Sequence, residues 1–427
     1  MEQLALLCLT AVLHLLFTRL TRRLGGGEPL QVFTHIWYLA IYGYLFVDRL
    51  DGFEEYLISV DAYIYFLLIH GVYFFSWMLA SATANSLLHV SSSNFQFSFR
   101  GIHNRNIFRI TTILGAIGLA NNFLNVMNAG GPLIYFTLPL REVELIFGAN
   151  RLFNYLYFCN IFSLIVLPQV SVEYKFSRVK TISFLLYFVL ALSLHGVKGT
   201  LIFSIVAFYF SVKIVDRDKA PQVGMYVGAL SVGFFLLVTF LRLYNEGGDL
   251  DKVTSDAFVS IILILIKYFS TGLVNAALEI ERAAAIGLGG ETFASVTDVT
   301  CSLGKLFCAN QFADQANLNL WDPAYNTGTF IREYVRDFGF FGMYVCLVIQ
   351  AIIFAFLYSI ALKNLRTGFV VRAVIILMHF GVFFSNHFLK IQYLFMIVLA
   401  VALMKFSRRL PIGPAPNSPE TMRARPT

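Results

Sequence analysis

The sequence is dominated by a succession of long apolar stretches. Most run for roughly 17–24 residues, the length that an α-helix needs to cross a lipid bilayer. Hydrophobic residues make up 58% of the 427 positions and charged residues only 13%, which is about half the charged share of soluble domains. Because lipid leaves no backbone polar group unpaired, such stretches must be helical. We therefore predict an all-α polytopic membrane protein with about 11 transmembrane helices. The predicted spans lie near residues 1–18, 31–47, 57–80, 107–127, 151–170, 179–194, 200–215, 222–243, 339–362, 369–385 and 388–405.

The first apolar stretch resembles a signal peptide only superficially. Its arginines follow the apolar residues instead of preceding them, and no small-residue cleavage site is visible. We expect it to be retained as the first span.

Lysine and arginine are distributed unevenly among the connecting segments. If the C-terminus is cytoplasmic and the spans alternate, the segments on that side hold 20 of the 32 Lys and Arg residues, and the short segments on the other side hold 5. Cytoplasmic loops of membrane proteins are enriched in these residues. The alternation therefore predicts an external N-terminus and a cytoplasmic C-terminus. It also accounts for the net charge of +7 without a nucleic-acid partner.

The same alternation divides the chain into four parts. An N-terminal transmembrane bundle of about eight spans (1–243) precedes one long external loop (244–338), C-terminal transmembrane helices (339–406) and a Pro-bearing tail (407–427) that we expect to be cytoplasmic and disordered. Within the loop, residues 257–280 are nearly span-like. A crossing there would require a second one before the next span, so we expect a re-entrant or interfacial helix. Loops of this length commonly carry function.

Familiar nucleotide and metal motifs are absent from the sequence. There is no Walker A loop, dinucleotide-binding glycine fingerprint, HExxH motif or Cys-x-x-Cys pair. We expect no metal and no cofactor, and an outer-face reaction whose substrate brings its own activated bond. Cys301 and Cys308, both in the external loop, either pair in an oxidising compartment or remain free thiols.

Cationic residues flank apolar spans on the predicted outer side: Arg141, Lys198, Arg282, Arg332 and Arg336. A guanidinium group binds phosphate oxygens through two parallel hydrogen bonds. Any one of these residues alone is explained by snorkelling or a local ion pair. Their gathering on one side favours a lipid phosphate as the ligand.

Several residues on the same side could accept a proton from a hydroxyl nucleophile. The candidates are His195, Glu279, Glu281, Asp337 and His387. Asp337 follows Arg336 directly, so a structural salt bridge is its alternative role. His195, in a tight turn three residues before Lys198, is less easily explained by packing.

Residues 317–330 combine aromatic and amide side chains of the kind that hold sugars. Trp321 and Tyr325 offer flat faces, and Asn326 offers hydrogen bonds. The alternative is an ordinary loop rich in turn-forming residues.

The segment NTGTFIREYVRDFGFFG (326–342) resembles the end of the large external loop in bacterial Wzy-type oligosaccharide repeat-unit polymerases, which make O-antigen and capsule. The shared features are an Asn, a hydroxyl residue, an aromatic residue and Asp–Phe–Gly with a further Gly, entering a span. A weaker resemblance covers LSLHGVKGTLIF, where relatives often have Arg at the position of Lys198. The matching residues are Asn326, Thr327 or Thr329, Phe330, Asp337, Phe338, Gly339 and Gly342.

This resemblance implies a GT-C-like fold in the bacterial inner membrane, with the external loop in the periplasm. The protein would transfer a growing glycan from undecaprenyl diphosphate to the hydroxyl of a new lipid-linked repeat unit, without metal or cofactor. Its partners would be lipid-linked glycan, membrane lipid, and a chain-length regulator and a flippase. In this scheme Arg282 and Arg332 are the first candidates for binding the diphosphate, followed by Arg141, Arg336 and Lys198. The candidate bases are His195, Glu281 and Asp337. The residues expected to contact sugars are Trp321, Tyr325 and Asn326.

Three alternatives remain open. An O-antigen ligase would share both the topology and the diphosphate chemistry. A second alternative is a lipid-linked oligosaccharide flippase or other transporter. Transporters commonly show repeated halves and ionisable groups within their spans. Asp61, His70 and His379 are the chief ionisable candidates within the predicted spans of this chain. The halves of this chain do not repeat, and a transporter has little use for the long loop. A receptor or scaffold is the third alternative.

Overall fold

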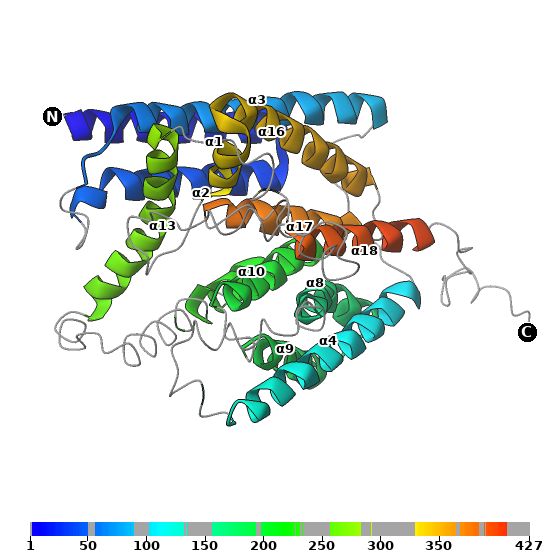
Figure 1. Ribbon diagram of the computed structural model, residues 1–427. Coiled ribbons are helices and arrows are strands. Elements are labelled where there is room, and N and C mark those ends of the chain that lie inside the picture. The colour runs from blue at the N-terminus through cyan, green and yellow to red at the C-terminus, as the bar shows by residue number, and fades with distance from the viewer. Residues whose placement is uncertain are drawn as a thin grey trace, which may run out of the picture.

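The regular structure of the described chain is entirely helical (Figure 1). The helices are α1 (Glu2–Leu24), α2 (Gly27–Leu45), α3 (Val60–Leu88), α4 (Ile102–Asn128), α8 (Tyr157–Glu173), α9 (Arg178–Ser193), α10 (Lys198–Val215), α13 (Ala257–Arg282), α16 (Phe330–Lys363), α17 (Gly368–Phe380) and α18 (Ile391–Ser407), with short 3₁₀ turns η1 (Val47–Arg49) and η2 (Gly381–Phe383). The computed structural model describes residues 2–49, 56–88, 102–131, 134, 156–193, 198–226, 228–230, 233, 257–282, 292, 329–363, 368–383, 388 and 390–407.

The predicted spans coincide with helices wherever the structure describes them. Most of the predicted span 222–243 lies outside the described residues. Among the residues that the structure describes, four helical segments are long and apolar enough to cross a membrane: Gln3–Leu24, Val60–Leu88, Asn104–Asn128 and Phe330–Lys363. Shorter apolar helices accompany them in α8, α10, α17 and α18. The chain therefore has the character of a multi-pass membrane protein, whereas the count of about 11 crossings and the GT-C-like arrangement remain predictions.

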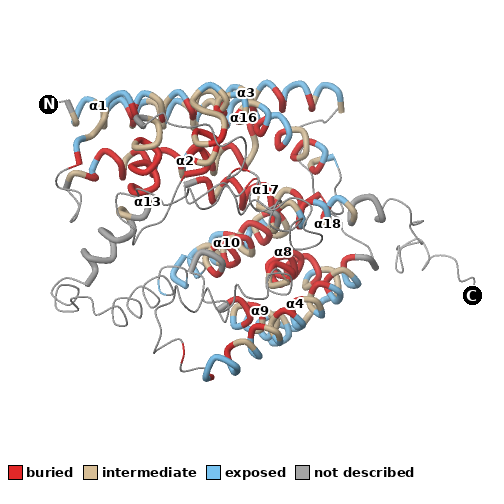
Figure 2. Tube along the Cα trace, in the orientation of Figure 1, coloured by how far each residue is buried: buried red, intermediate tan, exposed pale blue. Residues whose placement is uncertain are grey.

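Figure 2 shows exposed residues along α1, α3 and α4. Many of these exposed residues are large and apolar, such as Leu15, Leu79 and Ile113. On α9 the exposed side chains recur at helical spacing, so they form one stripe along the helix. A second stripe runs along α16. Polar groups such as His70, Ser163 and Asp337 are buried instead. This distribution suits helices that face lipid with apolar side chains and pack their polar groups inward. The two stripes comprise Val179, Ile182, Leu186 and Leu190 on α9, and Phe341, Val345 and Ile349 on α16.

Helix α17 lies at the centre of the molecule. It contacts α2, α10, α16 and α18, and its residues are buried along almost its whole length. Figure 1 shows it between the group formed by α1, α2, α3 and α16 and the group formed by α4, α8, α9 and α10. With 13 residues, α17 is about 20 Å long, which is shorter than a hydrocarbon core of about 30 Å.

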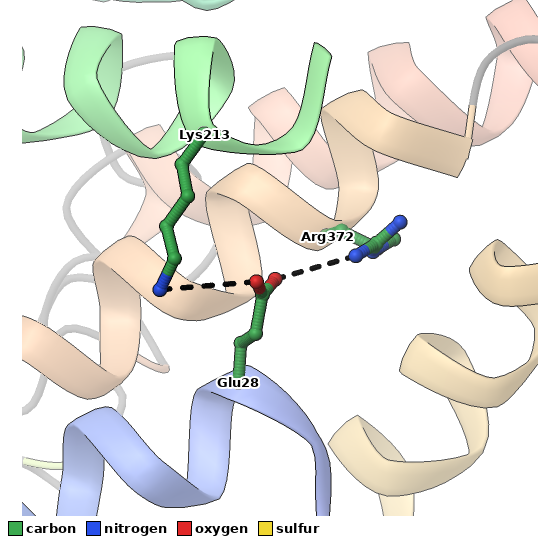
Figure 3. Close-up of polar contacts among 3 residues, drawn as sticks. All are labelled: Glu28, Lys213 and Arg372. Carbon is green, nitrogen blue, oxygen red and sulfur yellow. Dashed lines mark hydrogen bonds and ion pairs between the residues drawn. The ribbon is translucent and has the colours of Figure 1, made fainter. Parts of the chain in front are cut away.

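A partly buried ion cluster joins α17 to its neighbours near the start of α2 (Figure 3). Arg372 of α17 lies 3.3 Å from Oε2 of Glu28, and Lys213 of α10 lies 3.9 Å from Oε1 of the same carboxylate. The Arg372 guanidinium also lies over the ring of Tyr358, 5.8 Å from its centroid. These residues come from three segments that the charge distribution assigns to the cytoplasmic side, and they meet at one end of the helices.

Helix α16 is broken at Gly339 (φ 66°, ψ −177°), a conformation that glycine alone adopts without strain. The hydroxyl of Tyr334 donates a hydrogen bond to Oε1 of Gln350, 16 residues later. In a continuous helix these residues would be about 24 Å apart. The chain therefore folds back at Gly339. We call residues 330–338 the re-entrant segment.

The re-entrant segment begins inside the helix bundle and ends at one face of it. The ring of Phe330 packs against Phe33 and Trp37 near the middle of α2, with centroids 5.8 and 5.5 Å away. Phe340, just after the break, packs against Tyr65 near the start of α3 at 4.6 Å. We call the end of the bundle where α1 and α3 begin the outer end, following the predicted sidedness, and the end with the Glu28 ion cluster the inner end.

Helix α13 covers the range 257–280, for which the sequence predicts a helix. It crosses α2 steeply, near the C-terminal end of α2 (Figure 1). The crossing is close, because a Cβ atom on Gly43 would lie 2.8 Å from the Ser270 hydroxyl oxygen. Residues 270–277 are buried by this contact and by contacts with α3 and α16. The arrangement brings the last turns of α13 against the re-entrant segment.

Candidate functional site

Two arginines of the re-entrant segment share one carboxylate from α13. Arg332 and Arg336 are four residues apart and therefore lie on the same face of the short helix. The guanidinium of Arg336 donates to Oε1 of Glu279 at 2.5 Å, and Nε of Arg332 lies 3.7 Å from the same oxygen. The three side chains are 18%, 10% and 17% exposed, in the order Arg336, Arg332 and Glu279. The ion pairs are thus largely withdrawn from solvent.

Asp337 is more deeply buried, with 1% of its surface exposed. Its Oδ2 accepts a hydrogen bond from the backbone N–H of Thr292, and the Thr292 hydroxyl donates to the carbonyl oxygen of Glu333 at 3.4 Å. Thr292 lies between α13 and α16, in the range 244–338 that the sequence predicts as an external loop, and it contacts the re-entrant segment at this point.

A third cation comes from the segment before α18. The positive charge of Lys390 interacts with the carboxylate of Glu333. Phe388, two residues earlier, packs its ring against Phe330 at 6.1 Å. The charged cluster, as we define it, comprises Glu279, Arg332, Glu333, Arg336, Asp337 and Lys390.

The structure brings together only some of the predicted site residues. Arg332, Arg336 and Asp337 meet in the charged cluster. Glu281 and Arg282 end α13, within one turn of Glu279, and the structure describes their backbone only. The same holds for Lys198, the first residue of α10. The other predicted residues, His195, Arg141, Trp321, Tyr325 and Asn326, lie outside the described residues, as do His387, Cys301 and Cys308.

The sequence does not predict how deeply the charged cluster is buried. Arg332 and Asp337 are buried among helices, because the re-entrant segment starts at the middle of α2. The sequence shows the apolar run that follows but not the reversal at Gly339.

Sequence reasoning missed the bridging role of Glu279 and the presence of Lys390. Glu279 was a candidate base, but it is separated from Arg336 by 57 residues, so no local pattern reveals their pairing. The sequence contains a weak indication of the role of Lys390. A cation at the start of the last predicted span is unusual in a segment whose other residues are apolar.

The two histidines within predicted spans, His70 and His379, both form hydrogen bonds in the core. Nδ1 of His379 donates to the carbonyl of Ile375 at 2.7 Å, which leaves Nε2 to accept from the hydroxyl of Tyr73 at 2.8 Å. Nε2 of His70 lies 3.2 Å from the hydroxyl of Thr34. Asp61 is exposed in the first turn of α3. Each histidine thus has a hydrogen-bond partner in the core.

Across the described residues, no group of three or more His, Cys, Asp and Glu side chains is placed to hold a metal ion. The charged cluster has a different composition, because its cations are as numerous as its acids. Paired guanidinium groups in an apolar bundle are suited to hold an anion with several oxygens, such as a phosphate or diphosphate.

No family model, curated protein or solved structure matches this chain.

Proposed function

We propose that the protein is a metal-independent glycosyltransferase that joins undecaprenyl-diphosphate-linked oligosaccharide units into polysaccharide at the periplasmic face of a bacterial inner membrane. The observation that carries the proposal is the pair Arg332 and Arg336, held side by side within an apolar helix bundle. Both lie in the segment whose sequence resembles Wzy-type polymerases. The same segment forms the break and return at Gly339.

The chemistry follows from where charge develops. The hydroxyl oxygen of the acceptor sugar forms a bond to the anomeric carbon of the donor while the bond from that carbon to the diphosphate oxygen breaks. The electron pair goes to the leaving diphosphate, and guanidinium groups that bind it more tightly as its charge grows lower the barrier. One well-placed donor of this kind is worth about 3–4 kcal/mol.

The acceptor hydroxyl must lose its proton during the transfer. Two candidate bases, Asp337 and Glu279, lie within the charged cluster. Asp337 is the one that belongs to the re-entrant segment, two turns from its start. Glu281 and His195 remain the other candidates for this role. Trp321, Tyr325 and Asn326 remain candidates for sugar contact.

The outer end of the bundle suits a substrate from the periplasm. The re-entrant segment leads from the bundle interior to this end, and the Glu28 ion cluster marks the other. A lipid diphosphate would approach from the outer leaflet with its polyprenyl chain along the apolar faces of the helices. A chain-length regulator and a flippase are the expected protein partners.

Purified protein in lipid nanodiscs, incubated with a lipid-linked repeat unit, tests the proposal. We expect a ladder of glycan lengths on a gel. Arg332→Ala and Arg282→Ala should each lower the rate by roughly 10²–10³-fold, because each removes a positive group from the developing charge. The control is Lys219→Ala, whose side chain is 69% exposed and lies outside the cluster.

Full-length polymer from the arginine variants would refute their assignment. Absence of a ladder with the host's own repeat unit would refute the polymerase. A single product that carries finished glycan on another lipid would identify a ligase.

A lipid-linked oligosaccharide flippase is the second candidate. Interrupted helices at membrane depth are common in transporters, and α16 is broken while α17 has only 13 residues. In proteoliposomes a flippase would move the lipid-linked unit across the bilayer and form no new glycosidic bond.

A further inference from the structure

The charged cluster is electrically balanced before any ligand binds. Among its described side chains, Arg332, Arg336 and Lys390 carry positive charge, and Glu279, Glu333 and Asp337 carry negative charge. A diphosphate ester adds at least two further negative charges. In a bundle interior, an excess of buried like charge is costly. One of the acids must therefore withdraw from the arginines before a diphosphate can take their hydrogen bonds.

Glu279 is the acid in the position to do so. Its Oε1 lies against both Arg332 and Arg336, and it reaches them from a different helix. A carboxylate presents planar oxygens to guanidinium groups in the same way as a phosphoryl group does. Asp337 instead accepts a backbone hydrogen bond from Thr292, and the charge of Glu333 interacts with that of Lys390.

We propose that Glu279 occupies the phosphate position in the ligand-free protein and is displaced when the lipid diphosphate binds. This inference rests on the proposed function and identifies how the same site receives its ligand. Glu279 keeps the two guanidinium groups together while the site is empty. The incoming phosphoryl oxygens then replace its carboxylate on both arginines.

Displacement has a consequence for α13. Glu279 stands three residues before the last residue of this helix. When its carboxylate leaves the arginines, α13 loses an ion-pair contact with the re-entrant segment. Diphosphate binding is therefore coupled to a shift of the end of α13.

The test compares anion binding by wild-type protein and Glu279→Gln, both purified in nanodiscs. Inorganic pyrophosphate and undecaprenyl diphosphate are titrated separately by calorimetry. The amide keeps the shape of Glu279 but no longer competes as an anion, so we expect both ligands to bind roughly tenfold more tightly to the variant. Glu279→Asp, which keeps the charge on a shorter arm, should bind more tightly than wild type by a smaller factor.

Asp216→Asn is the matched control. Asp216 also pairs with a cation, Lys219, but lies beyond the end of α10, away from the cluster, so its loss should leave the affinity unchanged. A second variant, Glu279→Gln with Arg336→Ala, should lose the gain, because the phosphate then lacks one of its guanidinium ligands.

The outcomes separate the two hypotheses. Unchanged or weaker binding by Glu279→Gln, with clear binding by wild type, would overturn the displacement and leave the proposed function intact. If wild type and variants bind neither pyrophosphate nor undecaprenyl diphosphate, the proposed diphosphate site itself is wrong. Binding of pyrophosphate without undecaprenyl diphosphate would support the displacement for a free phosphate ligand and count against the lipid-linked substrate.

Discussion

At the scale of single residues, one glycine determines where Arg332 and Arg336 lie. Gly339 adopts a backbone conformation closed to other residues without strain, and this reverses the chain after Phe338. The reversal carries Arg332 and Arg336 into the bundle, where Glu279 meets them. Without it, α16 would continue straight and its charges would extend beyond the helices that now surround them.

Gly339→Ala should therefore impair both folding and function. The strained backbone costs about 1–3 kcal/mol, so we expect a lower melting temperature in detergent and loss of the glycan ladder. Gly71→Ala is the control, because Gly71 is helical and a Cβ atom there meets nothing within 4 Å. A Gly339→Ala protein with wild-type melting temperature and activity would show that the break is dispensable.

At the scale of helices, the sequence predicts which segments are helical better than it predicts where those helices break or how they cross. Apolar length identifies α1, α3 and α4 because lipid enforces helix over any such stretch. It does not identify the break within α16, since residues 330–338 and 340–363 each remain favourable for helix. It also does not reveal that α13 crosses α2, because the close approach of Gly43 and Ser270 depends on packing between distant segments.

Substitutions in the apolar stripe of α9 test whether this helix faces lipid. Leu186 is 56% exposed near the middle of the stripe, and an arginine at the centre of a membrane helix costs about 2.5–3.5 kcal/mol. Leu186→Arg should therefore reduce membrane insertion, measured as protein recovered in the alkali-washed membrane fraction. Val179→Arg, at the start of the same stripe, should be tolerated because its side chain can reach the interface.

Normal insertion of Leu186→Arg would mean that α9 does not cross the membrane. The predicted number of spans would then be too high, and the sidedness of every segment before α9 would have to be revised.

At the scale of the whole molecule, the two ends differ in chemistry. The inner end holds the Glu28 ion cluster and a contact in which Lys363 donates to the carbonyl oxygen of Leu88 at 2.7 Å. The charged cluster lies inside the bundle on the segment that leads to the outer end. Lysine and arginine counts predicted which segments share a side, but not that the candidate site lies within the bundle, since depth depends on how α13, α16 and the segment before α18 pack together.

Cysteine labelling from one side of the membrane tests this polarity. In a background without native cysteines, Asn128→Cys at the end of α4 should react with an impermeant maleimide in spheroplasts. Lys219→Cys should react only after permeabilisation. Both positions are exposed, so access depends on sidedness alone. The reverse pattern would place the charged cluster towards the cytoplasm and would remove the basis for a periplasmic transferase.

The central place of α17 has a consequence for biogenesis. Its residues, 368–380, are synthesised after α2, α10 and α16, yet all three helices pack against them. These earlier helices must remain in the membrane with incomplete neighbours until α17 has been made. The centre of the bundle therefore assembles only after α17 emerges, and until then lipid or insertion factors must shield the faces that α17 later covers.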